Sequence, residues 1–145
     1  MTLLAGLLMA GALFESAPKP THFDVSATFT PARRNASAEV AIQFLARDPD
    51  VKINEHPAPR LKMDGGPAAV VPARPVPPAK GGPEAGGPGH YLDLTLPVTF
   101  PVTLEPGTPR GSHDAKGTVT FFYCSRREGW CRKGTAEVVF PISVP

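Results

Sequence analysis

Proline and glycine limit what this chain can fold into more than any other feature. The 145 residues include 19 prolines and 14 glycines. Proline blocks the interior of a helix and glycine disfavours it, so long regular helices are nearly excluded. An apolar fraction of 41% still supplies enough side chains for a core, and the length fits one domain. We therefore expect a single domain built mainly from strands.

The strand signals come from alternating apolar and polar residues, the period of a half-buried strand. Such alternation runs through Phe23–Phe29, Glu39–Leu45 and, over the longest distance, Tyr91–Leu104. In the last segment Pro97 and Pro101 remove two backbone donors on the same side, which favours a sheet edge or a bend between two sheets. Two more strands are expected at 117–124 and 131–144. Six or seven short strands without a helical period predict an all-β antiparallel sandwich.

The N-terminus carries a separate apolar run, from Leu3 to Phe14. It is too short to span a bilayer, which needs about 20 residues. It fits the core of a secretory signal, and Ala10-Gly11-Ala12 supplies a small-residue cleavage pattern, although no Lys or Arg follows Met1. We interpret residues 1–17 as a signal peptide or a short N-terminal helix, and residues 21–145 as the domain. A signal would make the mature chain periplasmic or secreted, without a stable membrane span.

Composition also narrows the function classes. A net charge of +2, from 15 basic and 13 acidic residues, argues against a nucleic-acid binder. The four histidines are scattered without the spacing of metal ligands, so we expect no metal site and no cofactor. The stretch from Pro57 to Gly89 is rich in proline and glycine, and only the pieces around Leu61–Met63 and Ala68–Val71 could pair as strands. A Pro/Gly-rich loop is predicted at residues 64–89. We interpret this loop either as a flexible connector or as a lid over a site.

The two cysteines, Cys124 and Cys131, can be tested as a pair across a hairpin. If they are opposed, Thr120 faces Thr135 and Phe122 faces Lys133 on the same, largely polar face. The apolar residues of both strands then fall together on the other face, which supports the register. These apolar residues are Val119, Phe121, Tyr123, Ala136, Val138, Phe140 and Ile142. The pairing predicts a disulfide near the hairpin tip, pointing away from the core and at least partly exposed.

Two interpretations of this disulfide remain open. Arg126, Arg127, Arg132 and Lys133 surround it, and positive charge favours a thiolate and speeds thiol–disulfide exchange. Alternatively, closing a loop of about eight residues should stabilise the fold by roughly 2.5 kcal/mol, which is reason enough for a purely structural bond. The chain would then be a non-enzymatic, protein-binding β-sandwich. Trp130 is correspondingly either a packing residue or a partner contact.

The segments Leu94–Phe100 and Gly117–Cys124, followed by a second cysteine after a short loop, resemble the N-terminal periplasmic domain of the bacterial thiol:disulfide interchange protein DsbD family. The segment Asp50–Asn54 with Pro57 is also similar to the middle region of that family. The resemblance covers most of the chain from Phe23 onward. It is most specific in the C-terminal third.

This resemblance implies an immunoglobulin-like sandwich and a redox-active cysteine pair, Cys124 and Cys131. The pair would exchange electrons through mixed disulfides with extracytoplasmic thioredoxin-like partners, with Cys124 as the nucleophile by analogy. The family separates its cysteines by five residues, whereas this chain has six between them. The family also shields its disulfide with an aromatic cap, for which His90 and Tyr91 are nearest by position. Tyr91, Arg126 and Trp130 are the candidate cap or partner-contact residues.

Overall fold

The computed structural model describes residues 22–35, 37–71 and 90–145, so the signal or helix expected at 1–17 lies outside the described residues. The described residues form eight β-strands and no helix. The strands are β1 (Phe23–Thr30), β2 (Glu39–Ala46), β3 (Val51–Ile53), β4 (Arg60–Gly65), β5 (Ala68–Val70), β6 (Val98–Leu104), β7 (Gly111–Ser125) and β8 (Trp130–Val144).

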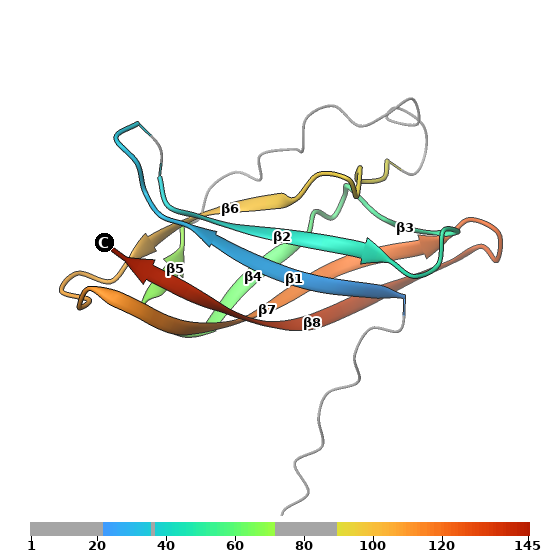
Figure 1. Ribbon diagram of the computed structural model, residues 1–145. Helices are drawn as coiled ribbons and strands as arrows, with labels where there is room; N and C mark the ends of the chain where they lie inside the picture. The colour runs from blue at the N-terminus through green and yellow to red at the C-terminus, as the bar shows by residue number, and fades with distance from the viewer. Residues whose placement is uncertain (1–21, 36, 72–89) are drawn as a thin grey trace, which may run out of the picture.

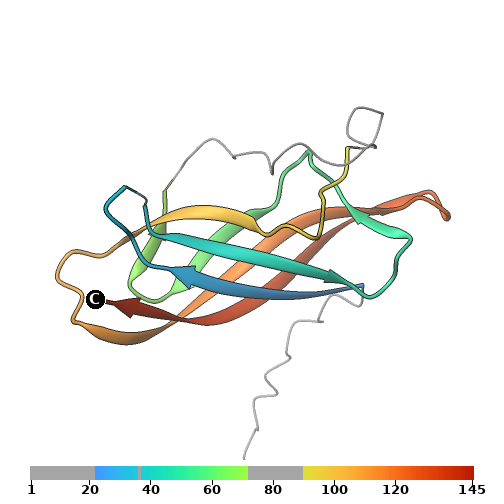
Figure 2. The same cartoon turned by 45° about the horizontal axis from the view of Figure 1, so that its top comes forward.

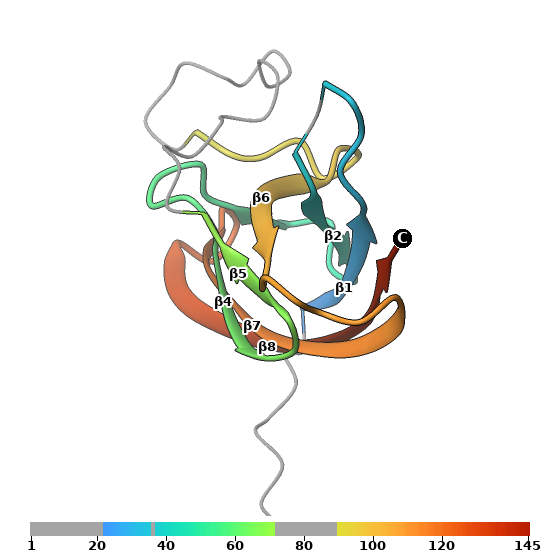
Figure 3. The same cartoon turned by 90° about the vertical axis from the view of Figure 1, so that its left-hand side faces the viewer.

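The strands form two antiparallel sheets that face each other (Figures 1 and 3). The first sheet has the order β1-β2-β6-β5. In the second, β8 pairs with one side of the long strand β7, and β3 and β4 pair with its other side, one after the other along its length. The prediction of an all-β antiparallel fold is therefore confirmed, and its two layers are those of a β-sandwich.

The core lies between the sheets and follows the period-two pattern of the sequence. Every second residue is buried from Ala115 to Tyr123 of β7 and from Gly134 to Ile142 of β8, and Phe121 is 0% exposed. The Phe121 ring meets Phe23 and Phe44 of the first sheet edge-on, at centroid distances of 5.7 Å and 5.1 Å. Opposite Phe121, a Cβ atom on Gly134 would come within 2.8 Å of the ring, so only glycine leaves room for it. These aromatic contacts pack β7, the strand that carries Cys124, against the first sheet.

The β7–β8 hairpin has the register that the sequence predicts. Cys124 is opposite Cys131, Thr120 is opposite Thr135, and the pairing runs without a bulge from Gly111 to Ser125 of β7. Figures 1 and 2 show the loop end of this hairpin extending past the ends of β1 and β2. The hairpin therefore presents the cysteines at one end of the sandwich.

The strand expected over Tyr91–Leu104 is shorter than its alternating pattern suggests. Only Val98–Leu104 forms a strand, whereas Tyr91 makes an isolated bridge to Asn54. The sequence predicts an edge or a bend for this segment. Strand β6 lies between β2 and β5 in the sheet order, but it pairs with β2 through Val98–Pro101 and with β5 through Val102–Leu104, so each half has one neighbour. Pro101 lies where the pairing changes from β2 to β5. Val71 N donates to Pro101 O over 2.9 Å, and Pro101 has no N–H to return, so the β5–β6 ladder ends there.

The first part of the predicted Pro/Gly-rich loop is ordered by pairing. The end of β4, a turn at Gly66 and the short strand β5 occupy residues 64–70. Strands β4 and β5 form at the two pieces that the sequence allowed as strands, around Leu61–Met63 and Ala68–Val71. Residues 72–89 lie outside the described part of the chain, so the choice between connector and lid stays a prediction.

Candidate functional site

The two cysteines form a disulfide across the β7–β8 ladder, as the hairpin register predicts. The Sγ atoms are 2.03 Å apart and the Cα atoms 4.0 Å apart. Cys124 alternates with the core residues Phe121 and Tyr123, so its side chain is on the outer face of the sheet. The bond lies next to the loop that joins the two strands.

The two ends of the disulfide differ in exposure. Cys131 is exposed, as expected, but Cys124 is only 6% exposed, although it points away from the core. Strand β3 accounts for the difference, because it pairs with β7 and sets Lys52 opposite Cys124. Beyond Lys52, Asn54 places its Oδ1 atom 3.2 Å from Cys124 Sγ. On the other side, β8 pairs with β7 alone among the described strands, so Cys131 stays open to solvent.

The loop between the cysteines is held by Asp50, from the turn before β3. The Ser125 hydroxyl donates to Asp50 Oδ2 over 2.5 Å, and the backbone N–H of Arg127 donates to the same carboxylate over 3.2–3.3 Å. Ser125 is itself 3% exposed and accepts the N–H of Glu128 on its hydroxyl. Gly129 closes the loop with a left-handed φ of 73° and donates its N–H to Ser125 O. These hydrogen bonds hold the loop of residues 125–129 in one conformation.

The charge of Asp50 is stabilised by the same contacts. The hydrogen bond from the Ser125 hydroxyl holds the pKa of the Asp50 carboxyl below its ordinary value. Burial raises the pKa, whereas the Arg127 N–H and the charges of Arg127 and Arg126 lower it further. A depressed pKa in the folded state means that the carboxylate stabilises the fold above the unfolded-state pKa of about 3.9.

We expect Asp50→Asn to lower the free energy of unfolding at pH 7. As the pH falls from about 4 through the lower folded-state pKa, the wild type loses this contribution and the difference between the two proteins shrinks. Urea denaturation of both proteins across that range measures it. Asp114→Asn, at an exposed position of β7, is the control. A difference that stays constant with pH would contradict the role given to the carboxylate.

Trp130 belongs to an aromatic group on the core side of the hairpin end. Its half-buried ring meets His22 and Tyr123 at centroid distances of 5.6 Å and 5.7 Å, and Arg132 stacks 4.2 Å above its centroid. The indole N–H donates to Glu128 Oε2. These contacts favour packing, the first of the two roles considered for Trp130.

The other candidate residues lie beside β3 and in the hairpin loop. Tyr91 is half-buried and forms a β-bridge with Asn54. Strand β3, which carries Lys52, therefore lies between the segment of Tyr91 and strand β7, which carries Cys124. His90 accepts the N–H of Glu55 on its backbone oxygen, and its ring nitrogen lies 3.7 Å from the Glu55 carboxylate. Arg126 is exposed in the hairpin loop. The role of Tyr91 as a cap and of Arg126 as a partner contact remain predictions.

Sequence reasoning assigned no role at the disulfide to three polar residues in and beside β3. Lys52 and Asn54 alternate with the buried Val51 and Ile53 and share the outer face with Cys124. Asp50, in the turn before β3, binds Ser125. The alternation alone could have indicated a short strand with one polar face. It could not indicate that this face borders the disulfide, since the contacts join residues 70 to 75 positions apart.

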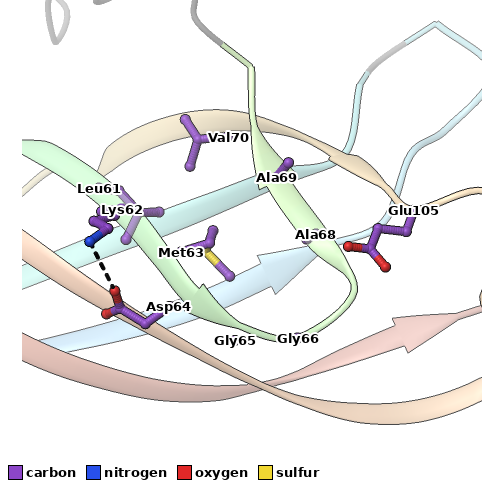
Figure 4. Close-up of a pocket in the computed structure, with 10 residues that line it drawn as sticks. All are labelled: Leu61, Lys62, Met63, Asp64, Gly65, Gly66, Ala68, Ala69, Val70 and Glu105. Carbon is purple, nitrogen blue, oxygen red and sulfur yellow. Dashed lines mark ion pairs between the residues drawn. The ribbon is translucent and has the colours of Figure 1, made fainter.

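A separate open pocket of about 470 Å³ lies at the β4–β5 corner (Figure 4). Its charged residues are Lys62, Asp64 and Glu105, and Lys62 Nζ is 3.8 Å from Asp64 Oδ1. The pocket shares no residue with the cysteine hairpin. Lys62 is opposite Thr118, six residues along β7 from Cys124, which corresponds to about 20 Å of extended strand. It therefore does not contribute to the candidate site.

Comparisons with known proteins do not assign the chain to a family. No protein-family model, no curated protein and no solved structure matches it. Within residues 22–35, 37–71 and 90–145, the side chains form no group of three or more His, Cys, Asp or Glu able to hold a metal ion. The same residues contain no helix of the length and apolarity that a membrane crossing requires. The site's geometry is thus the basis for a functional hypothesis.

Proposed function

We propose that this chain is a thiol–disulfide exchange domain in which Cys124 and Cys131 pass electrons to or from a thioredoxin-like partner. The observation that carries the proposal is the asymmetry of the disulfide, with Cys131 exposed and Cys124 covered. A partner can reach one sulfur while the other is held inside the protein. The resemblance of Leu94–Phe100 and Gly117–Cys124 to the DsbD family supports the same function.

The exchange begins with attack by a partner thiolate on Cys131 Sγ. A bond forms between the partner sulfur and Cys131, the Cys124–Cys131 bond breaks, and Cys124 leaves with the electron pair as a thiolate and takes up a proton. The partner's second thiolate then attacks the partner sulfur of the mixed disulfide and releases Cys131. The partner dithiol is oxidised and this chain is reduced by two electrons. The reverse sequence passes electrons from this chain to an oxidised partner.

This order of events corrects the role that analogy assigned to the cysteines. Analogy makes Cys124 the nucleophile, but a side chain that is 6% exposed is poorly accessible to an incoming sulfur. We therefore assign attack, and the mixed disulfide, to Cys131. Cys124 becomes the leaving group and, in the reverse direction, the resolving thiol.

Asn54 is suited to both protonation states of Cys124. Its Oδ1 atom, 3.2 Å from Cys124 Sγ, can accept a hydrogen bond from the thiol. A rotation of the amide by 180° brings the NH₂ group to the same place, where it can donate to a thiolate. Lys52, directly opposite Cys124, adds a positive charge on the same face. Both groups offset the penalty for burying a leaving thiolate, since a lower leaving-group pKa speeds exchange.

We also propose that the domain works outside the cytoplasm, in the periplasm or as a secreted protein. Disulfides persist in oxidising compartments and are rare where glutathione and thioredoxin keep thiols reduced. The apolar run at Leu3–Phe14, interpreted as a secretory signal, supports the same location.

A protein-binding module with a structural disulfide is the second candidate. It is favoured by the burial of Cys124 and by the clamp from Asp50 on the loop. A redox titration separates the two. A reduction potential below about −300 mV would indicate a bond that resists the glutathione pool and would exclude the exchange function.

The direct test uses a thioredoxin whose resolving cysteine is replaced by serine. With an excess of this thioredoxin and rapid alkylation of the released Cys124 thiol, which would otherwise reverse the step, we expect the oxidised wild-type chain to be trapped as a mixed disulfide, and peptide mass mapping to place the bond on Cys131. The Cys124→Ser variant, activated at Cys131 by exchange with the disulfide of 2-nitro-5-thiobenzoate, should form the same adduct and release 2-nitro-5-thiobenzoate. Activated Cys131→Ser should react far more slowly. Absence of any adduct with the wild type, or an adduct on Cys124, would refute the proposed mechanism.

A further inference from the structure

The surface around the exposed sulfur is strongly basic for a chain of net charge +2. Lys133 lies two residues from Cys131 on the same face of β8, and Lys52 lies opposite Cys124 on the other side of β7. Arg126 and Arg127 are exposed in the loop, and Arg132, next to Cys131, is exposed on the opposite face of β8, over the Trp130 ring. We call these five residues the basic collar: Lys52, Arg126, Arg127, Arg132 and Lys133. They are a third of the chain's 15 basic residues.

Two of the carboxylates in this region, Asp50 and Glu128, are engaged by the loop. Asp50 accepts the Ser125 hydroxyl and the Arg127 N–H, and Arg127 Nε lies 3.9 Å from it. Glu128 accepts the Trp130 indole N–H. On the outer face of the sheet, the charged side chains next to the disulfide along the strand pairing are Lys52 and Lys133, so this face carries positive charge at the bond. The field of these charges raises the local concentration of anionic partners and slows the approach of cationic ones.

We propose that the basic collar selects a partner whose reactive cysteine lies on an acidic surface. This inference deepens the proposed function and rests on it. The nucleophile in the exchange is an anionic thiolate, and the leaving group develops a second negative charge at Cys124. Lys52 and Lys133 flank that bond on its solvent side, so their charges act on the approach of the partner and on the bond-breaking step.

The test compares two cysteine peptides as probes, one with aspartates beside its cysteine and one with lysines. The rate of attack on the oxidised chain is measured for each and divided by its thiolate fraction, obtained by titration. At an ionic strength of about 10 mM, we expect the acidic peptide to react at least about fivefold faster than the basic peptide. The preference should fall towards unity at about 0.5 M salt, where screening is nearly complete.

A pair of matched variants locates the effect. Lys52→Gln/Lys133→Gln removes the two charges nearest the disulfide. Lys62→Gln/Lys116→Gln removes two charges from the same sheet, on β4 and on β7 eight residues before Cys124. We expect the first variant to lose most of the preference and the second to keep it within about twofold. Equal rates for the two peptides in the wild type, or equal losses in both variants, would overturn the inference.

Failure of the selection for acidic partners can be distinguished from failure of the proposed exchange function. A chain that forms the thioredoxin adduct at Cys131 without any charge preference keeps the exchange function and refutes the selection of acidic partners. A chain that prefers the acidic peptide but forms no adduct with thioredoxin refutes the exchange function, and the selection proposed for it, at the same time.

Discussion

Replacing Phe121 with alanine is expected to lower the free energy of unfolding by about 3–5 kcal/mol. Phe121 is 0% exposed, and its ring packs against Phe23 and Phe44 of the opposite sheet and against Tyr123 of its own strand. Removing it leaves a cavity at the contact between the two layers. Urea denaturation, followed by the fluorescence of the single tryptophan, measures the loss.

Phe122→Ala is the matched control for this prediction. Phe122 is the next residue of β7, half-buried on the outer face and opposite Lys133. Because its side chain is outside the core, the same deletion should cost markedly less. Equal losses for the two variants would mean that the two faces of β7 contribute equally to stability, against the core described above.

Removing the disulfide is expected to lower the free energy of unfolding by about 2.5 kcal/mol, from the chain entropy of a loop of eight residues. The variant is Cys124→Ala/Cys131→Ala, measured by urea denaturation with and without a reductant. Dithiothreitol should destabilise the wild type by a similar amount and leave the variant unchanged. The fifteen-pair β7–β8 ladder and the Asp50 contacts remain in both cases, so the reduced domain should stay folded.

This result bears on function, because an exchange domain must be stable with its cysteines reduced. Unfolding of the wild type on simple reduction would contradict the prediction. It would make the bond a requirement for folding, in favour of the module with a structural disulfide.

The proposed exchange therefore depends on two features with different origins. The β7–β8 hairpin brings Cys124 and Cys131 together, and β3 covers one of them. The first feature makes a disulfide possible. The second makes its two sulfurs chemically unequal, which is the property on which the proposed order of attack depends.

The hairpin could be predicted from the sequence because its contacts are local. The cysteines are seven residues apart, and placing them opposite each other brings Val119, Phe121 and Tyr123 onto one face with the apolar residues of the next strand. A shift by one residue would turn the core side chains to solvent, so the pattern determines the face of each residue. By contrast, the alternation at Tyr91–Leu104 predicted too long a strand, because only Val98–Leu104 forms one. Apolar side chains can share one face of a segment without a neighbouring strand that pairs with its backbone.

The amino-acid sequence by itself determined an all-β chain, the pairing of its cysteines and the side of the sheet on which they lie. Only the tertiary structure decided that Cys124 is covered and Cys131 is open. The contacts of Asn54 and Asp50 with the hairpin join residues 70 and 75 positions apart. They form because β3 takes the side of β7 that β8 leaves free. Such a choice depends on how the whole chain closes its two sheets, and no local pattern of side chains encodes it.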